Sequence, residues 1–439
     1  MMLFYKLRGT PKTDMPGLLA CKLCPDFLRR VSKPKLTIAL TGTNGKTTTS
    51  ALVNDFLLSQ GYSTSFNDWG ANLMAGFATN LIRGVGIFNR PRVDCSVLEA
   101  DELSMDIEMS KIRPDYILVT NICKDSLRRN GHPENIFNHI ENCMRIVGKD
   151  TTAILNANDP ISVGLGKDTS RVYFGIEDDS FSPMSNISRD ISVCPVCDGK
   201  LSYDYRLYRH IGKYRCTDCD FMTPECKYIA RGIDLENKTM LLNGEEMPLI
   251  SDTMFNCFNV LSAAALFMEL GYDAKLIADF LRGQKITDIR ESSVKYKGIE
   301  YYAYAAKSQN VSAAATVFEY MAKEPSMKDV VLLMDEVQDR HHPTETISWL
   351  YETDYEFLNS PNIKKIIVGG HMYLNHKLRL LLAGVPEEKI VAVEAEADIP
   401  KNVDTEGIEK VYVLYEIDYV TKAKNMRDSI VEYAKGVKK

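Results

Sequence analysis

The first part of the chain alternates short apolar runs with segments of helical periodicity. The apolar run Leu36–Thr41 ends at a glycine-rich turn, and apolar residues then recur at helical spacing within Thr47–Gln60. The apolar face of this expected helix consists of Leu52, Val53, Phe56 and Leu57. Three later runs resemble buried strands, and they are Val93–Ala100, Asp115–Thr120 and Thr152–Asn156, with a helix predicted at Pro133–Val147. Such alternation predicts a mostly parallel, doubly wound α/β sheet.

The pattern changes in the middle of the chain and then returns. Around Cys194–Cys219 four cysteines are mixed with tyrosines and the alternation stops, which predicts a small inserted module. Helical periodicity resumes at Asn256–Leu270 and Ala274–Leu281, and a second α/β unit follows from about Ser293. Its expected strands are Val330–Met334, Lys365–Val368, Ile390–Val393 and Val411–Tyr415, and its expected helices are Ser312–Met321, Leu374–Leu382 and Lys422–Ala434.

These changes of pattern set the expected domain boundaries. Residues 1–35 form an N-terminal segment, and residues 36–285 form a central domain with an insertion at 190–222. Residues 290–439 form a Rossmann-like C-terminal domain. At 439 residues the chain suits about three ordinary domains.

Composition and charge exclude several classes of protein. The chain is 45% hydrophobic and 26% charged, so it can bury sizeable cores. A net charge of −6 argues against a dedicated nucleic-acid binder. No stretch approaches the ~18 unbroken apolar residues of a membrane span, and the four apolar residues before Lys6 are too few for a signal-peptide core. Eleven cysteines in such a chain are expected to be free thiols or metal ligands, in a cytoplasmic protein.

A glycine-rich loop after the first expected strand is typical of a phosphate site. It reads Gly42-Thr43-Asn44-Gly45-Lys46-Thr47-Thr48 and opens the helix that follows. Glycines allow backbone N–H groups to surround phosphate oxygens, and the helix N-terminus favours negative charge. Lys46 can reach the terminal phosphates, and the Thr47 hydroxyl can hold Mg²⁺. The loop is shorter than the common Walker form, in which position 40 would be glycine instead of Leu40.

A magnesium nucleotide requires a further hard oxygen ligand. Glu99 and Asp101 lie just past Val93–Leu98, the buried part of an expected strand. Parallel sheets bind ligands at the carboxyl ends of their strands. We therefore predict Glu99 as the second magnesium ligand beside Thr47.

Two CxxC pairs predict a metal site in the inserted module. One pair is Cys194 and Cys197, and the other is Cys216 and Cys219. The 18 residues between Cys197 and Cys216 give zinc-ribbon spacing. Four thiolates fill a tetrahedral Zn²⁺ and leave no open position, so the expected role is structural. A third CxxC, Cys21–Cys24, has no partner pair and is predicted to carry no metal.

The loop and the acidic segment Glu99–Glu102 together resemble the Mur ligase superfamily of ATP-dependent amide-forming enzymes, and the four-cysteine insertion resembles its MurT branch. The likeness covers nearly the whole chain. Further segments similar to family motifs are Asn67–Asn72, Thr120-Asn121, Asp125, Leu155–Pro160 and Phe255–Asn259. The resemblance places Asn256 and Asn259 near the adenine of ATP. It also places Arg290 at a family arginine, although Ile289 replaces the family glycine before it.

The resemblance implies a reaction in peptidoglycan synthesis. ATP would phosphorylate the α-carboxylate of D-glutamate in the lipid II stem peptide, and ammonia would attack the acyl phosphate to give D-isoglutamine. Lys46 and Mg²⁺ would neutralise the charge of the transferred phosphoryl group. In the family, ammonia comes from a separate glutamine amidotransferase subunit, which implies a heterodimer here. Cys95 lies within an expected strand, where no sharp turn exposes it as a glutaminase nucleophile. Membrane contact is expected only through the lipid-linked substrate, at the inner face of the membrane.

The C-terminal stretches depart from the family pattern. The place of the family's C-terminal catalytic aspartate falls on Thr346, and Glu345 is one residue away. A threonine hydroxyl has no useful basicity near neutral pH, so we predict that Glu345 substitutes for that acid. Two alternatives stay open. One is a Mur-like ligase that joins another amine or amino acid to a carboxylate without a glutaminase, and the other is a non-catalytic nucleotide-binding paralogue.

Overall fold

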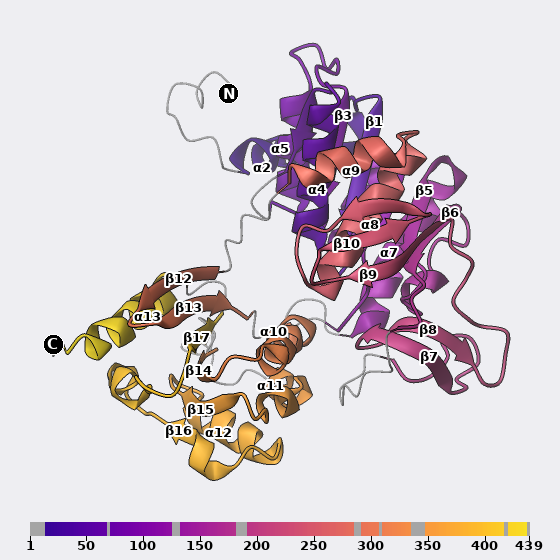
Figure 1. The fold of residues 1–439 in the computed structure, drawn as a ribbon. Coiled ribbons are helices and arrows are strands. Elements are labelled where there is room, and N and C mark those ends of the chain that lie inside the picture. The colour runs from indigo at the N-terminus through magenta and orange to yellow at the C-terminus, as the bar shows by residue number, and fades with distance from the viewer. Residues whose placement is uncertain are drawn as a thin grey trace. The chain divides into compact units, whose positions relative to one another are not determined.

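The computed structural model describes residues 14–67, 71–124, 132–180, 191–284, 291–306, 310–334, 347–416 and 420–436. These residues form two compact units (Figure 1), the first from the described residues within 14–123, 132–180 and 191–284, and the second mainly from those within 291–436. No helix in the described part of the chain combines the length and the apolar character that a membrane span needs.

The first unit is built on a nine-stranded sheet in the order β11-β10-β9-β6-β5-β4-β1-β3-β2. Its strands from β2 to β9 along this order pair in parallel, and β10 and β11 add an antiparallel edge. The strands are β1 (Leu36–Thr41), β2 (Thr64–Phe66), β3 (Cys95–Glu99), β4 (Tyr116–Val119), β5 (Thr152–Asn156), β6 (Ser170–Ile176), β9 (Tyr228–Asp234), β10 (Thr239–Leu242) and β11 (Glu245–Pro248). The predicted doubly wound parallel sheet is confirmed.

Helices cover both faces of this sheet. Alternate side chains of its central strands point to opposite sides, and the apolar ones on each side need a helix layer to bury them. Ile38 and Leu40 of β1 enter one core with residues of α4, α8 and α9, whereas Ala39 enters a second core with residues of α5 and α7 (Figure 1). The helices of this unit are α2 (Met15–Leu23), α3 (Phe27–Arg30), α4 (Lys46–Ser59), α5 (Met74–Gly84), α6 (Ser110–Ile112), α7 (Pro133–Val147), α8 (Met254–Glu269) and α9 (Ala274–Arg282). The predicted apolar face of α4 is buried as expected.

The inserted module between β6 and β9 carries its own hairpin. Strands β7 (Leu201–Tyr208) and β8 (Ile211–Cys216) pair in antiparallel register and form a separate two-stranded sheet (Figure 1). Tyr205, Leu207 and Ile211 nevertheless enter the core beneath α8, so the hairpin packs on the first unit. The sequence did not predict these strands, since tyrosines and charged residues blur their alternation.

The second unit is a six-stranded sheet in the order β12-β13-β17-β14-β15-β16. All neighbouring strands are parallel except the hairpin β12–β13 at one edge. The strands are β12 (Glu291–Tyr296), β13 (Ile299–Ala305), β14 (Lys328–Leu333), β15 (Ile363–Val368), β16 (Ile390–Ala392) and β17 (Lys410–Tyr415), and the helices are α10 (Val311–Lys323), α11 (Ser348–Glu352), α12 (Tyr373–Leu382) and α13 (Val420–Ala434). Apolar cores lie on both faces of this sheet, as expected for the predicted second α/β unit.

Candidate functional site

The glycine-rich loop lies at the carboxyl edge of the first sheet. It leaves β1 between β3 and β4, and α4 begins at Lys46. Gly42 and Gly45 have positive φ angles of 122° and 88°, which favour glycine. A Cβ atom at Gly45 would lie 2.0 Å from Asn259 Oδ1, and one at Gly42 would lie 2.4 Å from Thr120 Oγ1. Both glycines are therefore required by backbone conformation and by close packing.

The segment after β4 fixes the conformation of this loop. Asn121 accepts a hydrogen bond from the Thr43 backbone N–H at its carbonyl, at 2.8 Å. Its side chain accepts from the Asn44 N–H at 3.2 Å and donates to the Asn44 carbonyl at 3.0 Å. Thr43 Oγ1 accepts from the Cys123 N–H at 2.9 Å, and Thr120 Oγ1 donates to the Asn44 carbonyl at 2.7 Å. The Thr120-Asn121 motif thus supports the phosphate loop directly.

The Lys46 side chain is held by two oxygen acceptors. Its ammonium donates to the Gly42 carbonyl at 2.7 Å and to Glu102 Oε1 at 2.6 Å. The Lys46 side chain is 15% exposed and that of Glu102 is 1% exposed. Burial alone lowers the pKa of Lys46, but the carboxylates of Glu102, Asp101 and Glu99 outweigh it and raise the pKa. Lys46 is therefore a charged group in a carboxylate-lined site.

Glu102 is a site residue that sequence reasoning missed. It follows β3 in the same acidic run as Glu99, but sequence analysis assigned it no partner. Its distance of 56 positions from Lys46 carries no local signal, and only the parallel pairing of β1 with β3 brings the two residues together. A buried charge requires an opposite charge nearby, so the buried Glu102 carboxylate and the partly buried Lys46 ammonium stabilise each other.

Glu99 lies where the magnesium prediction requires it. Its carboxylate accepts from Thr47 Oγ1 at 3.3 Å and from Ser50 Oγ at 3.4 Å. Asn67 fixes the backbone of Glu99 by accepting from its N–H at 2.8 Å and donating to its carbonyl at 2.7 Å. Asp101 differs, because its carboxylate accepts from the Leu103 N–H and caps the following turn.

Two asparagines of α8 lie at the same end of the loop. Asn259 contacts Gly45 closely, and its Nδ2 donates to Asn256 Oδ1 at 2.9 Å. Asn256 in turn donates to Thr253 Oγ1 at 2.8 Å. Both side chains are buried. The structure therefore brings Asn256 and Asn259 to the phosphate loop, whereas the predicted site residues Arg290 and Glu345 lie outside the described residues, as does Asp125.

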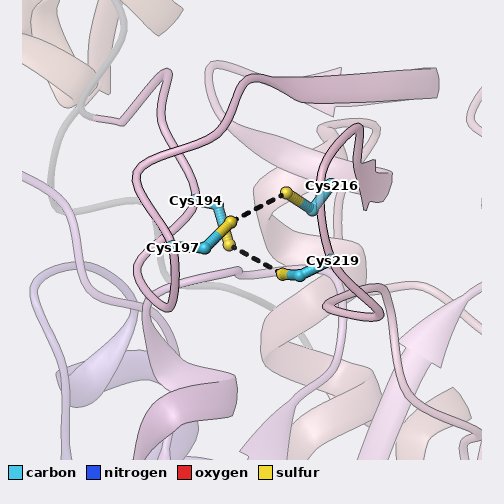
Figure 2. Close-up of side chains that lie close together, drawn as sticks. All are labelled: Cys194, Cys197, Cys216 and Cys219. Atoms are coloured by element: carbon cyan, nitrogen blue, oxygen red, sulfur yellow. Dashed lines mark hydrogen bonds between the residues drawn. The ribbon is translucent and has the colours of Figure 1, made fainter.

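The four predicted zinc ligands form one cluster (Figure 2). All four sulfur atoms lie within 4.8 Å of one another. Sγ atoms are 3.7 Å apart for Cys194 and Cys219 and 3.5 Å apart for Cys197 and Cys216. Four thiolates at zinc-bonding distance around one tetrahedral ion would be about 3.8 Å apart. The donor set and its spacing therefore fit a zinc ion.

The backbone around the cluster has the form of two matched turns. The Val196 N–H donates to Cys194 Sγ at 3.4 Å, and the Asp218 N–H donates to Cys216 Sγ at 3.3 Å. Such N–H groups stabilise thiolates, which are the form of cysteine that binds metal. A small apolar cluster lies beneath the turns, and it includes Leu201, Tyr214 and Phe221. So small a core favours a metal as the main source of stability in this module.

The remaining thiols give no sign of chemistry. Burial raises the pKa of Cys95 on β3 to about 11, which disfavours the thiolate that a nucleophile needs. Cys21 is buried in α2 and its pKa is also raised by burial, and it forms no disulfide with Cys24. Neither residue belongs to a metal-type cluster among the described residues.

Comparisons with known proteins agree with this architecture. The profile of the Mur ligase middle domain matches residues 40–195, and that of the MurT ligase C-terminal region matches residues 308–418. A Staphylococcus aureus protein named lipid II isoglutaminyl synthase (glutamine-hydrolyzing) subunit MurT is 30% identical over 404 residues, which cover 91% of this chain and 89% of that protein. Its namesake from Streptococcus pneumoniae is 25% identical over 406 residues, covering 92% and 89%.

Solved structures share the fold at lower identity. A pseudomurein peptide ligase type C from Methanothermus fervidus has a TM-score of 0.70 at 20% identity, covering 92% of this chain and 81% of that chain. MurF from Acinetobacter baumannii has a TM-score of 0.64 at 15% identity, covering 92% and 78%. These two structures share the fold alone, whereas the family follows from the two profiles and the 30% identical relative: the chain belongs to the MurT family of the Mur ligases.

Proposed function

We propose that this ligase amidates the α-carboxylate of D-glutamate in the lipid II stem peptide, by way of an acyl phosphate, with ammonia from a glutamine amidotransferase partner. The observation that carries the proposal is the match along 91% of the chain to a protein named as a subunit of a glutamine-hydrolysing lipid II isoglutaminyl synthase. The arrangement of Lys46, Thr47 and Glu99 supports it, because phosphoryl transfer relies on positioning and charge neutralisation.

In this proposal the loop residues Gly42–Thr48 bind the phosphates of ATP. The N–H groups at the start of α4 face the phosphates, and Lys46 moves its ammonium from the Gly42 carbonyl to a phosphate oxygen while it keeps Glu102. Asn256 and Asn259, with Arg290, contact the nucleoside end. Thr47 and Glu99 would hold Mg²⁺, which would neutralise negative charge on the phosphates. A carboxylate becomes a reactive acyl donor only after such phosphorylation, since it otherwise lacks a good leaving group.

Glu99→Gln tests the magnesium assignment. The substitution keeps the shape of the side chain and removes its charge, so the Mg²⁺ concentration for half-maximal activity is expected to rise about tenfold. ATP turnover measured over a range of Mg²⁺ concentrations provides the readout. Asp101→Asn is the matched control, because asparagine keeps the acceptor that caps Leu103. An unchanged Mg²⁺ requirement in Glu99→Gln would reject this ligand.

The four-cysteine module has a structural role in this proposal. Cys194, Cys197, Cys216 and Cys219 bind one Zn²⁺ and leave no position for a substrate. The ammonia for the reaction comes from a partner subunit, in keeping with the name of the S. aureus relative as a subunit. The buried Cys95 is unsuited to release it. In this proposal the enzyme works in the cytoplasm and meets its lipid-linked substrate at the inner face of the membrane.

Glu345 is proposed as the base of the second step. Glu345→Gln is expected to lower amide formation from ammonium far more than capture of the acyl phosphate by hydroxylamine. Ammonium must lose a proton before it attacks, whereas hydroxylamine is already neutral near pH 7. The ratio of amide to hydroxamate, measured by mass spectrometry, reports the difference. Thr346→Ala should leave this ratio unchanged, and equal ratios in all three proteins would dismiss the assignment.

A further inference from the structure

The turn of the β7–β8 hairpin inserts a histidine into the first unit. His210 Nε2 lies 3.2 Å from Asp159 Oδ1, and both side chains are fully buried. Asp159 belongs to the segment after β5 that resembles a family motif, and sequence analysis assigned it no function. A buried carboxylate requires donors around it, and His210 supplies one from a module 51 positions away.

The other donors to Asp159 lie in the segments that follow β4 and β5. Its Oδ2 accepts from the Ile122 backbone N–H at 2.7 Å and from the Ser162 hydroxyl, and its Oδ1 also accepts from the Ile161 N–H at 3.0 Å. Hydrogen bonds to a charged acceptor are the stronger ones. Asp159 therefore joins the cysteine module to the backbone at Ile122.

Ile122 lies between Asn121 and Cys123, two of the residues that hold the phosphate loop. Its neighbour Asn121 receives the Thr43 N–H at 2.8 Å and the Asn44 N–H at 3.2 Å, and its neighbour Cys123 donates to Thr43 Oγ1 at 2.9 Å. A shift of the Ile122 peptide would move both contacts. The path from His210 to the phosphate loop thus consists of hydrogen bonds and one short segment of backbone.

We propose that His210 is a positioning residue for the phosphate loop, so that the docked cysteine module sets the affinity of the enzyme for nucleotide. The inference rests on the proposed nucleotide site and adds a function for the module beyond its own stability. His210 touches no substrate in this account. It acts through Asp159 and Ile122, which keep the Asn121 and Cys123 contacts in register with the loop.

A general docking role is the competing explanation, because other bonds also attach the hairpin. Tyr205 donates its hydroxyl to the Ile176 carbonyl at 2.8 Å, and the Gly212 N–H donates to the Asn158 carbonyl at 2.9 Å. The Tyr205 bond ends on β6, at a carbonyl that is not a partner of Asp159, whereas the Gly212 bond ends on the residue just before Asp159. Tyr205→Phe is therefore a matched control, since it removes one buried bond of the same hairpin.

The test measures the affinity of the purified full chain for an ADP that carries a fluorescent group on its ribose. His210→Leu removes the donor at similar bulk and should weaken ADP binding about tenfold. His210→Gln places an amide N–H near the position of Nε2 and should restore affinity to within about twofold. Tyr205→Phe should leave it unchanged. Circular dichroism and zinc content establish that each variant is folded and loaded.

Coupling between the two sites must be reciprocal, which gives a second test without any variant. Binding of ADP to the unmodified chain should slow hydrogen exchange of the Ile211 and Gly212 amides, measured by mass spectrometry. Failure of the unmodified chain to bind ADP would refute the proposed nucleotide site itself. Normal ADP affinity in His210→Leu, an equal loss in Tyr205→Phe, or no slowing at the hairpin in a chain that binds ADP would overturn only the inference.

Discussion

Lys46→Ala is expected to lower ATP-dependent turnover about a thousandfold, because it removes the cation that faces the transferred phosphoryl group. The lysine is held at the start of α4 with its ammonium 2.6 Å from Glu102. Positive charge placed in advance, in a site with little water, stabilises the transition state more than the same charge in solution. ADP release measured with saturating Mg²⁺ and substrate provides the readout.

A separate control must show that a loss of activity in Lys46→Ala does not come from misfolding. Lys46 lies where the glycine-rich loop enters α4, but its ammonium pairs with a buried carboxylate, so its replacement also affects stability. Its loss leaves Glu102 buried beside no cation, which costs a few kcal/mol of stability. The double variant Lys46→Ala with Glu102→Gln removes that cost and should remain inactive. Lys35→Ala changes an exposed lysine just before β1 and should be fully active. Turnover at the normal rate in the double variant would refute the assignment of Lys46.

Cys197→Ser and Cys219→Ser are each expected to remove zinc from the purified protein. The unmodified chain should carry about one Zn²⁺, and three thiolates with one hydroxyl bind the metal far more weakly than four thiolates. Each variant should also become sensitive to limited proteolysis between residues 191 and 222, since the module has a small core of its own. Elemental analysis and peptide mapping measure the two effects.

Cys24→Ser serves as the control for both measurements. Cys24 is a half-buried thiol at the end of α2, outside the four-cysteine cluster, so zinc content should stay at about one ion per chain. Absence of zinc from the freshly purified, reduced, unmodified chain would rule out the metal site. Zinc that persists in both cysteine variants would do the same.

Features with a local signature could be predicted from the sequence. The phosphate loop needs glycine at positions with positive φ and a helix that begins at its lysine. Both features can be recognised from consecutive residues of the sequence. The four-cysteine cluster could be predicted from residue spacing, because each CxxC turn supplies two ligands. The helix Pro133–Val147 was predicted with its observed bounds, since a strong apolar periodicity begins at a proline and ends before a glycine.

Features that depend on distant pairing could not be predicted. The Lys46–Glu102 ion pair exists because β1 pairs with β3, and the His210–Asp159 contact exists because the β7–β8 hairpin packs beneath α8. Strands β12 and β13 were not predicted, because charged and tyrosine residues interrupt the apolar run that is typical of a buried strand. Residue spacing along the chain carries no information about such contacts, which the tertiary fold alone creates.

The most direct test of the account is an assay of lipid II with this chain, ATP, Mg²⁺ and ammonium, followed by mass spectrometry of the stem peptide. We expect conversion of the D-glutamate α-carboxylate to a carboxamide in step with ADP release. We also expect glutamine to replace ammonium only when an amidotransferase partner is added. Consumption of ATP without amidation at that carboxylate, in the presence of ammonium, would contradict the proposed function.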